Sequence, residues 1–126
     1  NDLNETKKWY TNTLDCLVGR ESDEWVDFNM FGHQVVAHLS NSVNTISTNK
    51  VDGKNVPINH FGVILKPADW NKLKEKLLLL DVEFIIKPTI RFKNSKGEQS
   101  TMFIKDPSGN ILEFKSFIDD RMIFKR

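Results

Sequence analysis

The chain has 126 residues, which is enough for one compact domain and too few for two ordinary ones. Hydrophobic residues make up 39% of the chain and charged residues 28%, which is typical of a globular protein and not of a disordered one. A formal net charge of +1 gives no basis for binding nucleic acid, and no apolar run is long enough to span a membrane. The single cysteine excludes an internal disulfide and no signal peptide is recognisable, so we expect a cytoplasmic protein.

One helix and three strands are predicted in the first half of the chain. Asp2, with Glu5 three residues later, resembles a capping box that starts the helix. One face of this helix carries Leu3, Thr6, Trp9, Tyr10 and Leu14. The predicted strands are Leu17–Arg20, Trp25–Met30 and His33–Leu39, with Gly32 in a tight turn between the last two. Residues 41–56 are rich in Asn, Ser and Thr and are predicted to be a linker.

The second half repeats this order and adds a strand in front of the helix. The helix is predicted to follow Pro67, with Asp69 as its N-cap and a length of about three turns. A strand that begins at Val82 is predicted to stop at Lys87, before Pro88. The other predicted strands are Ile58–Leu65, Gln99–Lys105 and Asn110–Phe117. The turn chemistry of Asp106-Pro107-Ser108-Gly109-Asn110 makes the last two strands a hairpin.

These elements predict an α+β fold, in which two tandem βαβββ modules form curved mixed sheets around a cleft. We expect a single domain over residues 1–126, with module one at residues 1–44 and module two at residues 57–126. Module one opens on its helix, so we expect its first strand to lie upstream or to have been lost from this sequence. Packing the modules together, within or between chains, buries both sheet faces and leaves a cleft suited to a ligand.

Alternation along the strands places three potential metal ligands opposite the apolar strand faces. His38, His60 and Glu113 can therefore converge on one interior. Two imidazoles and a carboxylate with open positions are typical of non-haem Fe(II), and the same ligand types suit Zn, Mn or Ni. Structural interpretations stay open beside this one. A strand histidine is commonly structural, Glu113 can lie on a solvated outer face, and His38 can cap the sheet edge.

Two segments of the second half carry motifs of a known family. They are the opening strand, Asn59-His60-Phe61-Gly62-Val63-Ile64-Leu65, and the closing segment at residues 103–114, FIKDPSGNILEF. Both resemble the glyoxalase/bleomycin resistance protein/extradiol dioxygenase family, the vicinal oxygen chelate superfamily, and the resemblance covers nearly the whole chain. In that family the D-P-x-G-N turn feeds a strand whose Glu is a metal ligand, and the opening strand supplies a His ligand. The resemblance therefore implies Glu113 and His60 as ligands.

The ligand of the first module is marked less clearly. Counted from Gly32, the register of Glu113 lands on Val36, which has no ligating atom. His38 lies on the same face and is chemically suited, so we predict it as the ligand, with Gln34 as the fallback. An additional ligand on the absent first strand stays open.

The resemblance also implies that Arg91 and the segment from Gly97 to Gln99 border the substrate site. Arg91 is predicted to bind a substrate carboxylate by a bidentate contact, and Gln99 to hydrogen-bond the substrate. An exposed loop position for Arg91 and a surface position at the strand end for Gln99 stay open. Glu113 or Glu98 is predicted to move a proton during catalysis.

We therefore expect a divalent-metal-dependent enzyme of the glyoxalase or dioxygenase type, acting on a small molecule with vicinal oxygens. Two His with one Glu slightly favour a dioxygenase over a glyoxalase-like lyase or isomerase, and the metal is Fe, Mn, Ni or Zn. The alternative is a non-catalytic protein that sequesters a small molecule, as the drug-binding members of the family do. The family resemblance also implies a homodimer.

Overall fold

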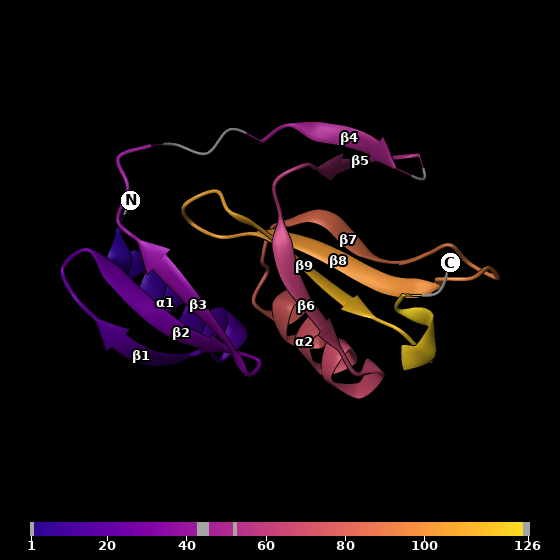
Figure 1. The fold of residues 1–126 in the computed structure, drawn as a ribbon, viewed down its shortest axis with the longest axis horizontal. Helices are drawn as coiled ribbons and strands as arrows, with labels where there is room; N and C mark the ends of the chain where they lie inside the picture. The colour runs from indigo at the N-terminus through magenta and orange to yellow at the C-terminus, as the bar shows by residue number, and fades with distance from the viewer. Residues whose placement is uncertain (1, 43–45, 52, 125–126) are drawn as a thin grey trace. The chain divides into compact units, whose positions relative to one another are not determined.

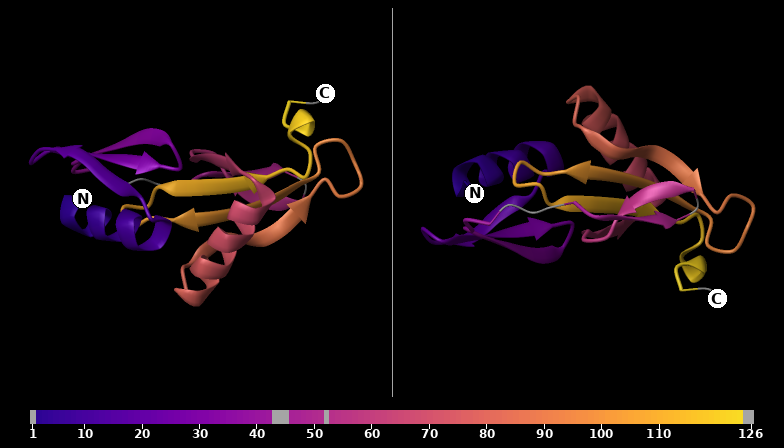
Figure 2. Two further views of the ribbon diagram at one scale, coloured as in Figure 1. Left: turned by 90° about the horizontal axis from the view of Figure 1, so that it is seen from below. Right: turned by 90° about the horizontal axis from the view of Figure 1, so that it is seen from above.

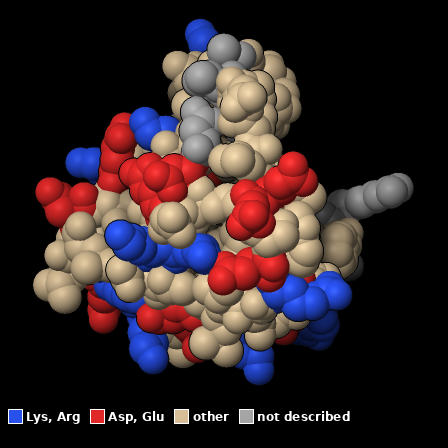
Figure 3. Space-filling view, turned by 90° about the vertical axis from the view of Figure 1, so that its left-hand side faces the viewer, with Lys and Arg blue, Asp and Glu red and all other residues tan. Residues whose placement is uncertain are grey.

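The computed structural model describes residues 2–42, 46–51 and 53–124. The chain forms two units, Asn1–Thr45 with Asp106–Asn110, and Ile46–Lys105 with Ile111–Arg126 (Figure 1). Within the described residues, neither helix has the length and apolar character that crossing a bilayer requires. Basic and acidic side chains are interspersed on the face that Figure 3 shows.

The first unit begins with helix α1, Leu3–Leu14. The carboxylate of Asp2 accepts hydrogen bonds from the backbone N–H groups of Asn4, at 2.8 Å, and Glu5, at 3.0 Å, which confirms the predicted N-cap. These two hydrogen bonds favour the ionised carboxylate and hold the pKa of Asp2 below its ordinary value. The helix ends at Leu14, and its C-cap Asp15 has a left-handed φ of 55°.

Three antiparallel strands complete this unit in the order β1-β2-β3. They are β1 (Leu17–Glu21), β2 (Trp25–Met30) and β3 (His33–His38). Phe31 and Gly32 both have positive φ, at 52° and 87°, as a two-residue hairpin turn requires. The apolar face of β2 is buried, and Phe28 stacks on Tyr10 of α1 with 4.8 Å between ring centroids. The predicted order α-β-β-β is confirmed.

The hydroxyl of Tyr10 is buried in this unit and donates a hydrogen bond to Oδ2 of Asp106 at 3.1 Å. Burial and the neighbouring Asp106 carboxylate both oppose a tyrosinate anion, and they raise the pKa of Tyr10 far above its ordinary value of 10.0. The folded protein therefore retains the Tyr10 proton at a pH where the unfolded chain releases it.

We expect the free energy of unfolding to fall as pH rises above 10.0, by up to about 1.4 kcal/mol per pH unit. The sign follows from linkage, because the raised pKa stabilises the fold fully below the unfolded value and less above it. Tyr10→Phe lacks the proton, and its stability is expected to decline less steeply in urea unfolding over this range. Tyr10 is the single tyrosine of the chain, so ultraviolet absorbance reads its ionisation directly. Tyrosinate forming near pH 10.0 in the folded parent would contradict the expectation.

The predicted linker at residues 41–56 is wrong over its second part. It contains β4 (Thr48–Val51), and β5 (Lys54–Pro57) pairs with β4 as an antiparallel hairpin. Residues 43–45 and 52 of that range lie outside the described residues. Most side chains of this hairpin are exposed, so its composition resembles that of a loop. Val56 is buried against Phe103 and Ile111, and that contact fixes the hairpin on the second unit.

The second unit is built on a four-stranded sheet in the order β6-β9-β8-β7. Its elements are β6 (Phe61–Leu65), α2 (Pro67–Leu79), β7 (Phe84–Arg91), β8 (Gln99–Lys105) and β9 (Ile111–Ser116), followed by the 3-10 turn η1 (Asp120–Met122). β6 runs parallel to β9, and the other pairs are antiparallel. The predicted order β-α-β-β-β and the mixed sheet are confirmed, and with them the α+β class.

Helix α2 covers one face of this sheet (Figure 2). Trp70, Leu73 and Leu77 of the helix are buried, and Nε1 of Trp70 donates to the carbonyl oxygen of Phe114 at 2.9 Å. The opposite face carries Phe103 and Ile111, packed under the β4–β5 hairpin. This second face also carries the candidate site.

Three predicted boundaries in the second unit are wrong. The strand predicted from Ile58 begins at Phe61, because Pro57 is still paired in β5. Lys66 and not Asp69 is the N-cap of α2, where Pro67 takes the first helical position. β7 runs through Pro88, which lacks an N–H but is tolerated because β7 is an edge strand with irregular register between Ile86 and Thr89.

Candidate metal site

His60 lies just before β6, and its imidazole is oriented by a backbone carbonyl. Nδ1 is 2.7 Å from the carbonyl oxygen of Pro57, and since that oxygen can only accept, Nδ1 carries the proton. In the neutral ring Nε2 then holds a free lone pair, and it lies 3.3 Å from Oε2 of Glu113. Metal-ligating histidines commonly donate one ring nitrogen to a backbone carbonyl, which fixes the tautomer and the orientation of the ring.

Glu113 occupies the middle of β9, opposite Phe103 of β8 and Gly62 of β6. Its side chain is only 7% exposed, so the interpretation as a solvated outer-face residue is wrong. Oγ1 of Thr101 donates to Oε1 at 2.7 Å and leaves Oε2 facing His60. Nζ of Lys115 lies 3.2 Å from the same Oε2 and partly balances the carboxylate charge.

The pair of His60 and Glu113 therefore brings two lone-pair donors within contact distance of each other. Nε2 of neutral His60 and Oε2 of Glu113, 3.3 Å apart, repel unless a cation or a proton lies between them. A divalent ion fits this donor set, because imidazole and carboxylate are common ligands of Fe, Mn, Ni and Zn. Among the residues that the structure describes, no group of three or more His, Cys, Asp or Glu is placed to hold a metal.

The third predicted ligand, His38, lies at the end of β3 in the first unit and is exposed. It pairs with Trp25 of β2 and shares the face of Val36 and Gln34, as the alternation predicts. Gln34, the fallback ligand, donates from Nε2 to Oδ2 of Asp27 at 2.9 Å. His38 belongs to the first unit and the pair of His60 and Glu113 to the second, and the role of His38 as a ligand stays a prediction.

Arg91 and Gln99 lie opposite each other at the ends of β7 and β8. Strand alternation puts both on the sheet face of Thr101 and Glu113. Arg91 is buried, not in an exposed loop, and its Nη2 donates to the carbonyl oxygen of Val51 at 3.1 Å. Within the described residues Oε1 of Gln99 is buried and accepts no hydrogen bond, so a donor from a ligand would satisfy it.

Glu98, the second predicted acid–base residue, belongs to the loop between β7 and β8. Its Oε2 accepts the backbone N–H of Asn94 at 2.6 Å, which stabilises the loop conformation. Phe92 and Asn94 in this loop both have positive φ, at 55° and 61°. The carboxylate of Glu98 thus has a structural contact of its own, and its catalytic role stays a prediction.

Thr101 and Lys115 are site residues that we did not predict. Lys115 is two residues after Glu113, so alternation alone placed it on the same face. Thr101 lies opposite Lys115 in the β8–β9 pair, and that register follows from the length of the Asp106–Asn110 turn. The signal for both was present in the hairpin register.

Comparisons with known proteins agree with this fold. The sequence model of the Glyoxalase/Bleomycin resistance protein/Dioxygenase superfamily matches residues 1–114. A search of curated proteins gives no significant match. A crystal structure of a glyoxalase/bleomycin resistance protein/dioxygenase from Alicyclobacillus acidocaldarius has 30% identity and a TM-score of 0.83, and the match covers 98% of this chain and 89% of that one.

Two fosfomycin resistance proteins share the fold at lower identity. FosX from Listeria monocytogenes, complexed with Mn(II) and 1S,2S-dihydroxypropylphosphonic acid, has 16% identity and a TM-score of 0.72, over 100% of this chain and 91% of that one. FosX from Mesorhizobium loti has 14% identity and a TM-score of 0.64, over 93% of this chain and 84% of that one. The family match over residues 1–114 carries the assignment, and this chain belongs to the glyoxalase/bleomycin resistance protein/dioxygenase superfamily.

Proposed function

We propose that this protein is a divalent-metal-dependent enzyme that acts on a small molecule with vicinal oxygens. One observation carries the proposal. Nε2 of His60 faces Oε2 of Glu113 at 3.3 Å, and both groups are held in that orientation by partners on their other sides. The Mn(II) complex of Listeria FosX, a protein of the same fold, supports a divalent ion as the cofactor.

Each residue of the site would then have its own role. His60 and Glu113 would hold a divalent ion, which would supply Lewis acidity to two neighbouring substrate oxygens. Pro57 and Thr101 fix the rotation of the two ligands, and the buried acceptor of Gln99 offers the substrate a hydrogen bond. Arg91, on the same sheet face, stays our candidate for a substrate carboxylate, and Glu98 with Glu113 for proton transfer.

Within this class we favour a dioxygenase slightly over a glyoxalase-like lyase. The preference rests on two imidazoles and one carboxylate as the ligand set, and so on His38 joining His60 and Glu113. A fourth ligand would favour Zn or Ni and the lyase. The homodimer expected from the family resemblance stays a prediction.

The replacements His60→Ala and Glu113→Gln are each expected to abolish stoichiometric metal binding, measured by elemental mass spectrometry on natively purified protein. Thr101→Val removes only an orienting contact and is expected to weaken binding by about 10- to 100-fold. His33→Ala is the matched control, because His33 is exposed at the start of β3. His38→Ala tests the third ligand, and the identity of the bound metal selects between oxygenase and lyase assays.

One observation favours the alternative, a non-catalytic binding protein. Lys115 lies 3.2 Å from Oε2 of Glu113 and balances its charge without a metal. If purified parent protein holds no metal, even after supplementation with Fe(II), Mn, Ni and Zn, the enzyme proposal is overturned. The same sheet face would then serve as a pocket wall for a sequestered ligand.

A further inference from the structure

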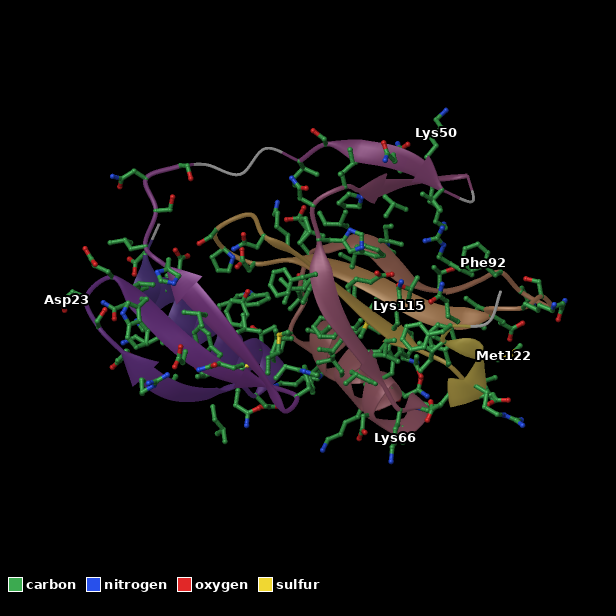
Figure 4. All side chains as sticks on the ribbon, in the orientation of Figure 1. Asp23, Lys50, Lys66, Phe92, Lys115 and Met122 are labelled. Atoms are coloured by element: carbon green, nitrogen blue, oxygen red, sulfur yellow. The ribbon has the colours of Figure 1, made fainter. Side chains whose placement is uncertain are left out.

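Lys115, labelled in Figure 4, belongs to β9, and strand alternation places it on the same sheet face as Glu113. Its Nζ is 3.2 Å from Oε2 of Glu113, the oxygen that also faces Nε2 of His60. The lysine side chain is 34% exposed, so its ammonium group is partly withdrawn from water. A cation in this position competes with a metal for the same carboxylate oxygen.

We propose that Lys115 is a substrate-binding residue that selects anionic substrates, those bearing a carboxylate, phosphate or phosphonate beside the vicinal oxygens. The inference rests on the proposed function. A divalent ion bound by neutral His60 and by Glu113 repels the Lys115 ammonium from the shared oxygen. The ammonium stays on the same face, because its Cα is fixed opposite Thr101 in the β8–β9 pair.

The net charge of this sheet face with a metal bound indicates which kind of group would pair with the Lys115 ammonium. A divalent cation and an ammonium outweigh the one carboxylate of Glu113, so the face carries excess positive charge. Within the described residues, Glu113 is the acidic side chain that forms an ion pair with Lys115. A partly buried ammonium that loses this partner is stabilised by another anion, and a substrate oxyanion supplies one.

The opposing interpretation is that Lys115 only balances the charge of Glu113. The two interpretations differ in what happens when the lysine is replaced. A balancing lysine supports the carboxylate and the fold, whereas a substrate-binding lysine is dispensable for metal binding and needed for binding an anion. Lys105 of β8 gives a matched control, because its side chain is also 34% exposed and pairs with an acidic residue, Glu83, which precedes β7.

The test uses the Mn(II)-loaded protein and inorganic phosphate as the probe, with both affinities measured by calorimetry. Lys115→Met is expected to bind Mn(II) at least as tightly as the parent and phosphate about tenfold more weakly. Lys115→Arg is expected to retain most of the phosphate affinity, and Lys105→Met to equal the parent.

The outcomes separate this inference from the proposed function. A parent that binds none of Fe(II), Mn, Ni and Zn overturns the proposed function and this inference with it. A parent that binds Mn(II) but no phosphate, or a Lys115→Met variant whose phosphate affinity stays within about twofold of the parent, overturns the anion subsite alone. Loss of Mn(II) from Lys115→Met also overturns it, because the lysine would then be supporting the carboxylate.

Discussion

Replacing Gly62 with alanine is expected to lower the free energy of unfolding by about 3 kcal/mol or more and to displace Glu113 from His60. Gly62 of β6 lies opposite Glu113 of β9 in the parallel pair. A Cβ atom at Gly62 would overlap the carbonyl oxygen of Glu113, and it would lie 2.6 Å from the carbonyl carbon and 2.9 Å from the nitrogen. These are backbone atoms, so relief requires that the two strands move apart.

Gly19→Ala is the matched control for this prediction, because Gly19 is also a strand glycine. Its added Cβ would meet Cβ of Asp27 at 3.2 Å, which a small shift relieves. Urea unfolding measures the stability of both variants, and calorimetric titration with Mn(II) measures whether the ligand pair is kept. Equal urea midpoints for the two alanine variants would contradict the prediction, because they would mean that β6 and β9 leave room for a Cβ atom at Gly62.

The proximity of His60 and Glu113 could be predicted from the sequence, because strand alternation and hairpin register determine the sheet face of each residue. Side chains alternate along a strand, so the buried Val63 and Leu65 of β6 indicate that even-numbered positions face the other side of the sheet, and His60 directly before β6 continues this pattern. The Asp106–Asn110 turn fixed the β8–β9 register, and with it the face of Glu113. The contacts that orient the pair were not accessible, because the Pro57 carbonyl reaches His60 through a bend that no periodicity encodes.

The elements that we mispredicted are those whose stability comes from distant partners. The β4–β5 hairpin has the composition of a loop, and most of its side chains are exposed, but the buried Val56 packs against the sheet. Pro88 stops a central strand but not an edge strand, and the sequence does not show which strand lies at the edge. The N-cap preference of Asp predicted that α2 starts at Asp69. The helix already begins at Pro67, whose fixed φ suits the first helical position.

Asp106→Ala is expected to destabilise the first unit by about 3 kcal/mol or more, because it removes the acceptor of the buried Tyr10 hydroxyl and of two partly buried donors of Asn110. Asp106 is 3% exposed. Its Oδ1 accepts the backbone N–H of Asn110 at 2.7 Å, and its Oδ2 accepts Nδ2 of Asn110 at 2.8 Å and the hydroxyl of Tyr10 at 3.1 Å. The carboxylate thus closes the turn before β9 and ties that turn to α1.

A double-mutant cycle separates the closing of the turn from the contact with the helix. Tyr10→Phe alone removes one hydrogen bond and is expected to cost about 1 kcal/mol in urea unfolding. Combined with Asp106→Ala it is expected to cost less than the sum, since no unsatisfied hydroxyl is left in the double variant, and the coupling is about 0.5 kcal/mol or larger. Full additivity would mean that the turn alone accounts for Asp106. A measurable coupling would mean that α1 also stabilises the turn from which the strand of Glu113 begins.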